Sequence, residues 1–130
     1  MDQIINWLME GDPAIRWQTL RDLMDAPERT WKAEQQRTMH VGWGAQLLSL
    51  QDNNGCWGGG VYTPKWTSTT YTLLVLHSIG IPRDCQAGQR GALLMLKELL
   101  GETCDTEFRQ KLKKCDRCIV GMILAALTLV

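Results

Sequence analysis

The sequence predicts an all-α fold, and three observations support this prediction. Apolar residues recur at intervals of three and four in several segments, which is the period of an amphipathic helix. Helix start and stop signals bound these segments, such as Asp12 before Pro13 at one start and Gly80 before Pro82 at one end. The third observation is an approximate repeat of a helix-loop-helix pattern every 47 to 49 residues, described below.

Residues 1–40 form a helical lead-in. A short apolar cluster is closed by Gly11, and a second helix begins at Pro13 with Asp12 as its N-cap; the cluster contains Ile4, Ile5, Trp7 and Leu8. Trp17, Leu20 and Met24 recur at i, i+3 and i+7, so this second helix is amphipathic and ends before Pro27. Its polar residues Arg16, Arg21 and Asp22 point away from the apolar stripe. Residues 28–39 are mostly polar with Trp31 isolated, and fit a solvated helix or a loop; we interpret them as a helix.

Residues 41–80 contain the clearest helical hairpin. The stretch 42–50, GWGAQLLSL, is typical of a buried helix, which the polar, glycine-rich stretch 51–60 must end. A long loop then leads to Trp66, and Thr67 or Ser68 can cap the next helix. This helix is apolar nearly all round from Tyr71 to Ile79, which predicts burial on most sides. Gly80 provides a left-handed C-terminal cap.

Residues 86–130 resemble the preceding hairpin in a degenerate form. A leucine-rich helix covers residues 86–100, and a polar connection leads to a last apolar helix at about 116–130. GALLMLKE at 91–98 aligns with GAQLLSLQ at 44–51, and GMILA at 121–125 aligns with TLLVL at 72–76. We therefore expect two helical hairpins, 41–80 and 86–130, which together with the lead-in make a single compact unit. The chain stops directly after its most apolar helix, so we expect it to be a shortened array.

Composition excludes several classes of partner and compartment. The 14 basic and 14 acidic residues cancel, so no overall field favours nucleic acid or an anionic membrane. The longest apolar run, 119–130, is too short to cross a bilayer. Five cysteines cannot all pair within one chain, and no segment has the order of a secretory signal. We expect a soluble, cytoplasmic protein.

The stretch 51–60, QDNNGCWGGG, raises the question of whether its glycines hold a phosphate group. A Walker loop needs Lys and then Ser or Thr directly after its last glycine, whereas Val61 and Tyr62 follow Gly60. The dinucleotide-binding pattern needs a preceding strand and a glycine spacing that is not found here. A structural role is the better interpretation. A Gln at a helix end can satisfy orphan backbone groups, and its amide can stack on an indole.

Gln51, Gly55 and Trp57, in the spacing Q-x3-G-x-W, together with the flanking GAQLLSL and WTSTTYTLLVL, resemble the glutamine-tryptophan repeat of squalene and hopene cyclases. The repeat is shared more broadly with protein prenyltransferase β subunits. The resemblance covers about residues 41–80 well and the second repeat weakly. It implies that Gln51 and Trp57 form a clasp between helices, with Gly55 allowing the backbone to turn close to them. Glycines 58–60 are expected to let the chain cross a neighbouring helix end.

The same resemblance implies an (α/α) toroid, in which five or six helix pairs close a ring around a cavity for an isoprenoid chain. This sequence has two pairs and a HEAT-like helical start, so we expect an incomplete ring. Its partners would be a second copy of itself or the remaining toroid helices, with an isoprenoid-like hydrophobic ligand. Tyr62, Trp66 and Tyr71, together with Trp57, could line such a cavity and stabilise a cation, although core and loop packing also accounts for them.

No catalytic or metal-binding residue is assigned. The cyclases use adjacent aspartates in an acidic cluster, whereas Asp105 and Glu107 are better read as charges in an exposed connection. The prenyltransferases hold zinc through Asp, Cys and His, but Cys115 and Cys118 form a single C-x2-C pair, typical of small buried residues on a helix. His77 is expected to be a packed or surface residue near a helix end, and His40 has no motif around it. We therefore expect no cofactor and no metal.

Two functional hypotheses follow. In the first, the chain is part of a cyclase-like or prenyltransferase-like protein and has no catalytic machinery of its own. In the second, it is a small helical scaffold that completes its core by self-association or by docking on a protein partner through its last apolar helix. Exposed apolar surface on that helix discriminates between them. A fragment should aggregate or bind hydrophobic dyes, whereas a natural module should form a defined oligomer.

Overall fold

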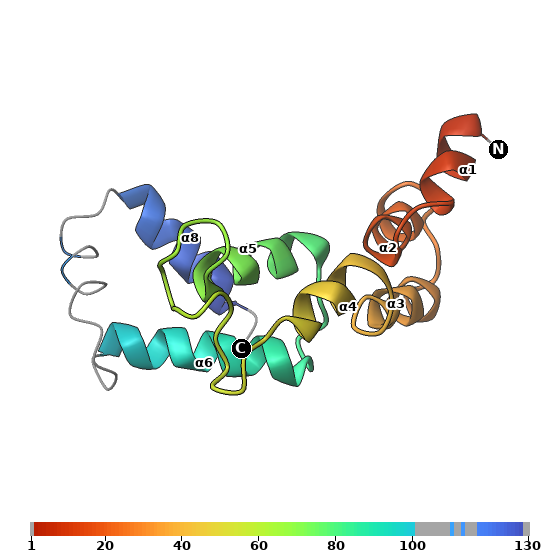
Figure 1. Ribbon diagram of the computed structural model, residues 1–130. Coiled ribbons are helices and arrows are strands. Elements are labelled where there is room, and N and C mark those ends of the chain that lie inside the picture. Colours follow the sequence, from red (N-terminus) through yellow and green to blue (C-terminus); the bar gives the residue numbers. More distant parts are fainter. Residues whose placement is uncertain (1, 101–109, 111–112, 114–116, 129–130) are drawn as a thin grey trace.

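The computed structural model describes residues 2–100, 110, 113 and 117–128. Within these residues all the regular elements are helices, which confirms the predicted all-α class. The helices are α1 (Gln3–Met9), α2 (Pro13–Asp22), α3 (Glu28–Arg37), α4 (Gly42–Ser49), α5 (Thr69–Ile79), α6 (Gln86–Leu100) and α8 (Arg117–Leu127). Figure 1 shows α1, α2 and α3 at one end of an elongated molecule, α5, α6 and α8 at the other, and α4 between them.

The helix boundaries follow local chemistry. Pro13 opens α2, and Oδ1 of Asp12 accepts a hydrogen bond from the Ala14 amide at 2.9 Å, as expected for an N-cap. Gly80 ends α5 in the left-handed conformation, with φ of 75°. Residues 28–37 are helical, which resolves the choice between helix and loop in favour of helix. The helix α6 covers residues 86–100 as expected.

The core lies between α5, α6, α8 and the loop that precedes α5. Leu73 and Leu76 of α5, Met95 of α6 and Ile123 of α8 are at most 2% exposed. Figure 1 shows α5 and α8 running in one general direction, with α4 and α6 running the opposite way. The helix α5 packs against α4, α6 and α8, so it is the central helix of this part of the chain. Its burial fits its almost continuous apolar sequence.

Hydrogen bonds join the lead-in to the C-terminal end of α5. The Trp17 indole N–H donates to the Ile79 carbonyl at 2.8 Å, and Nε2 of Gln35 donates to the Gly80 carbonyl at 2.8 Å. The last carbonyls of a helix have no partner within the helix, so α2 and α3 supply donors that α5 lacks. Asp12 adds a second link, since its Oδ2 accepts from the Trp43 amide at the start of α4.

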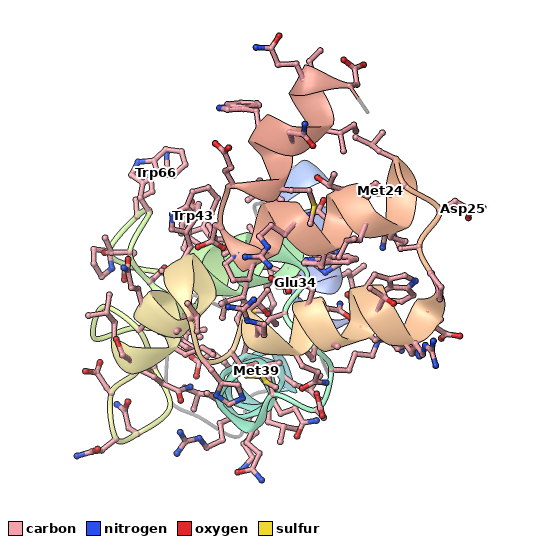
Figure 2. All side chains as sticks on the ribbon, turned by 90° about the vertical axis from the view of Figure 1, so that its right-hand side faces the viewer. Met24, Asp25, Glu34, Met39, Trp43 and Trp66 are labelled. Carbon is pink, nitrogen blue, oxygen red and sulfur yellow. The ribbon has the colours of Figure 1, made fainter. Side chains whose placement is uncertain are left out.

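Two details of the lead-in differ from the prediction. Trp31 is not isolated: its ring centroid lies 6.1 Å from that of the buried Trp17, because α2 and α3 pack face to face. Arg16 does not point away from the packed face but pairs with the buried Glu34 of α3 at 3.1 Å. Figure 2 shows Glu34 between the two helices. The periodicity of a single helix gave no sign of either contact, since both depend on its neighbour.

Candidate functional site

The side chain of Gln51 joins the end of α4 to the start of α6. Its Nε2 donates to the Gly55 carbonyl at 3.0 Å and to the Ala87 carbonyl at 2.8 Å. Its Oε1 accepts from Nη2 of Arg90 at 2.8 Å. The guanidinium can only donate, so this contact fixes which end of the amide faces the two carbonyls. Arg90 was not singled out from the sequence, where it is one of several arginines without a motif.

Trp57 contacts three helices from a position that is only 2% exposed. Its indole N–H donates to the Leu47 carbonyl in the last turn of α4 at 2.7 Å, and its amide donates to Oγ1 of Thr69 in the first turn of α5 at 3.0 Å. The edge of the ring lies against Gly91 of α6, where an added Cβ would stand 2.6 Å from Cζ3. The indole therefore fills a space between α4, α5 and α6 that requires glycine at position 91.

These contacts differ in detail from those the resemblance implies. The amide of Gln51 forms hydrogen bonds with two backbone carbonyls and with Arg90, and these bonds connect it with α6 rather than with the directly following α5. Gly55 has φ of 92°, a conformation that favours glycine. Gly58 lies close to Thr67, the residue before the N-cap of α5. A Cβ there would meet the carbonyl of Thr67 at 2.5 Å, so this glycine permits close approach within the loop itself.

Tyr62, Trp66 and Tyr71 lie together, and Trp66 is among the walls of a hollow that also includes Trp57. Ring centroids are 5.9 Å apart for Tyr62 and Tyr71, and 5.2 Å apart for Trp66 and Tyr71. Tyr71 is buried in α5, whereas Trp66 is 73% exposed. Figure 2 shows Trp66 projecting outward from the loop. The trio thus runs from the core to the surface.

Three adjoining hollows form a row on the surface, which we call the tryptophan groove. The first, of about 470 Å³, includes Trp7, Leu8, Ile15 and Trp43 among its walls. The second, of about 440 Å³, shares Ile15 and Trp43 with it and continues along Leu47, Leu74 and Val75. The third, of about 570 Å³, shares Leu47 and continues past Leu50 and Trp57 to Trp66.

Three tryptophans stand exposed along the tryptophan groove. Trp7 is 69% exposed, Trp43 is 52% exposed and Trp66 is 73% exposed. Figure 2 shows Trp43 and Trp66 projecting from the same side of the molecule. A single exposed aromatic side chain is common on protein surfaces and needs no explanation. Several large exposed aromatic side chains in one place, in contrast, mark an interaction surface. The sequence did not reveal this, because exposed and buried tryptophans look alike in a one-dimensional pattern.

The remaining candidates from the sequence are His40, His77, the carboxylates Asp105 and Glu107, and the cysteines Cys115 and Cys118. Among the described residues, no cluster of three or more His, Cys, Asp or Glu side chains could hold a metal ion. Nδ1 of His77 lies 3.4 Å from Oγ1 of Thr128, near the end of α5, and no contact of His40 suggests a role. Asp105, Glu107 and Cys115 lie outside the described residues, as does the side chain of Cys118.

Cys56 and Cys85 are buried free thiols in the core. Burial raises the pKa of Cys56, and the negative charges of Asp52 and Glu98 act in the same direction against a weaker lowering by Thr69. A raised pKa disfavours the thiolate, which is the nucleophilic form. Cys56 is therefore a packing residue and a poor candidate nucleophile.

Comparison with known proteins gave no match to a family model, to a curated protein or to a solved structure. Across the part of the chain that the structure describes, none of the helices has the length and apolar character needed to cross a membrane.

Proposed function

We propose that this chain is a non-enzymatic helical module that binds another protein through the tryptophan groove. The observation that carries the proposal is the exposure of Trp7, Trp43 and Trp66 along one row of hollows. Tryptophan is enriched in the energetic centres of protein interfaces, because it buries a large area at a small cost in conformational entropy.

The framework behind the groove supports a binding role. Gln51, Trp57 and Arg90 connect α4, α5 and α6 through hydrogen bonds. A groove whose walls are fixed in advance loses less free energy on binding than one that must be ordered. We infer that the loop 51–68 acts as a structural clasp that keeps the groove in shape.

Photo-crosslinking in the source cells tests the binding role. The full chain is expressed with benzoylphenylalanine in place of Trp43, and with the same residue in place of Asp25 as a control. Figure 2 shows Asp25 at the edge of the molecule opposite Trp43. We expect discrete adducts from position 43 and none from position 25. An adduct of twice the chain mass identifies self-association. Absence of adducts at 43, or equal adducts at both positions, would overturn the proposal.

A second candidate function is that of an incomplete (α/α) toroid of the terpenoid cyclase type, which holds an isoprenoid-like hydrophobic ligand. It is favoured by the parallel course of α5 and α8, by the opposite course of α4 and α6, and by the hollow between Trp57 and Trp66. Titration with farnesol should quench tryptophan emission in the native chain and fail to do so in Trp66→Ala. Equal quenching in both proteins would exclude this hollow as the ligand site.

A further inference from the structure

The charges along the tryptophan groove are of one sign. Three carboxylates are among its lining residues, Glu10 and Asp12 at one end and Asp52 at the other, and those linings include no Lys or Arg. One basic group, Lys65, lies beside these linings, with its ammonium 5.3 Å from the centroid of the Trp66 ring. The groove is therefore an apolar channel with an acidic group at each end.

Two of these carboxylates are available to a partner. Asp12 is already engaged, since its two oxygens accept from the amides of Ala14 and Trp43. Glu10 and Asp52 are exposed, and among the described residues neither forms an ion pair. A ligand that carries positive charge at both ends of an apolar stripe would pair with both groups and leave the tryptophans covered.

We propose that the tryptophan groove binds one amphipathic, basic helix of a partner protein, with its apolar stripe along Trp7, Trp43 and Leu47 and its Lys or Arg residues beside Glu10 and Asp52. This proposal rests on the proposed binding function and specifies its partner. A helix laid in a groove presents apolar anchors on one face and leaves its polar face to solvent, which suits a long open channel. An anionic membrane surface fits less well, because it attracts basic residues and would be repelled by the two carboxylates.

The test uses two fluorescein-labelled synthetic helical peptides with the same apolar stripe, one made of Leu and Lys and the other of Leu and Glu. Fluorescence anisotropy at low salt measures the binding of each peptide to the full chain. We expect the Leu/Lys probe to bind about tenfold more tightly or better, since attraction replaces repulsion at both ends. In Glu10→Gln/Asp52→Asn its affinity should fall about fivefold. The control Asp25→Asn/Asp84→Asn removes the same charge elsewhere and should leave affinity unchanged. Asn also tolerates the positive φ of 48° at position 25.

Trp43→Ala separates groove binding from a general attraction to charge. It should weaken the Leu/Lys probe by about tenfold or more, as expected for an anchor at the centre of an interface, with circular dichroism unchanged. Equal affinity for the two probes, no effect of Glu10→Gln/Asp52→Asn, or no effect of Trp43→Ala would each overturn the proposal. So would tighter binding of phosphatidylserine vesicles than of the Leu/Lys probe, or a stable dimer by light scattering that excludes the probe.

The outcomes distinguish this inference from the proposed function. If photo-crosslinks form at position 43 while the Leu/Lys probe fails to bind, the chain binds a protein of different chemistry and only the partner class is wrong. If no crosslinks form, the binding function itself fails.

Discussion

Trp57→Ala tests the role of the indole between α4, α5 and α6. Aromatic side chains bury about 150–250 Å² each, which at about 25 cal/mol per Å² corresponds to about 4–6 kcal/mol. Alanine retains a small part of this, and the lost hydrogen bond to the Leu47 carbonyl adds about 1 kcal/mol. Partial collapse of the surrounding helices into the cavity left by the indole offsets some of this loss of stability. We expect the free energy of unfolding to fall by about 4 kcal/mol, and by no less than about 3 kcal/mol.

Urea unfolding followed by far-ultraviolet circular dichroism measures this loss without relying on tryptophan fluorescence. Trp57→Phe keeps most of the ring but leaves the Leu47 carbonyl without its donor, so it should cost about 1–2 kcal/mol. Trp7→Ala is the matched control at a 69% exposed position and should change stability by less than about 0.5 kcal/mol. A loss below about 1 kcal/mol for Trp57→Ala would show that the indole does not hold these helices together.

Three further predictions use the same unfolding measurement. Gly91→Ala should destabilise by about 1–3 kcal/mol, since its Cβ would press on Trp57, whereas Gly121→Ala, with open space around it in α8, should stabilise by about 0.5–1 kcal/mol. Gln51→Ala should cost about 2 kcal/mol through the loss of three hydrogen bonds, one of them to a charged group. Burial raises the pKa of Cys56, so the unfolded chain loses this proton at a lower pH than the folded one. The contribution of Cys56 to stability should therefore be constant below about pH 8.5 and fall as the pH rises through the folded pKa, and Cys56→Ala should lack this part of the fall.

The results that would contradict these predictions differ from one to the next. Equal effects of the two glycine substitutions would mean that contact with the indole is unimportant. A neutral Gln51→Ala would mean that water replaces its partners without loss. The same alkaline decline in the Cys56→Ala variant as in the native chain would assign that decline to other groups.

Most of the helices could be predicted from local signals. Asp12 and Pro13 mark the start of α2, and the left-handed Gly80 marks the end of α5. Both signals depend only on neighbouring residues, so they can be recognised in the sequence. The extent of α6 followed in the same way from its leucine-rich pattern. Trp31 and Arg16 were misread because their partners, Trp17 and Glu34, lie on a different helix, and single-helix periodicity carries no information about the neighbour.

The site was predictable only in part, for the same reason. Gln51, Gly55 and Trp57 were singled out by their spacing, but the Ala87 carbonyl that Gln51 reaches depends on how α6 packs, which the spacing does not encode. The hydrogen bond from Arg90 to Gln51 depends on the same packing of α6. The exposure of Trp43 was missed because its helix was expected to be buried, whereas the open groove beside α2 leaves it 52% exposed.

The contacts of the lead-in with the end of α5 have a consequence for synthesis. Trp17 and Gln35 leave the ribosome early, but their acceptors at Ile79 and Gly80 follow 62 and 45 residues later. At about 5–20 residues per second, α2 and α3 must wait about 2–12 s for the helix end on which they close. During that interval Trp17, which is 4% exposed in the finished fold, has no completed site to occupy. The first part of the chain to be made thus completes its contacts only after Gly80 has been made, and a nascent chain shorter than about 80 residues is an attractive substrate for chaperones.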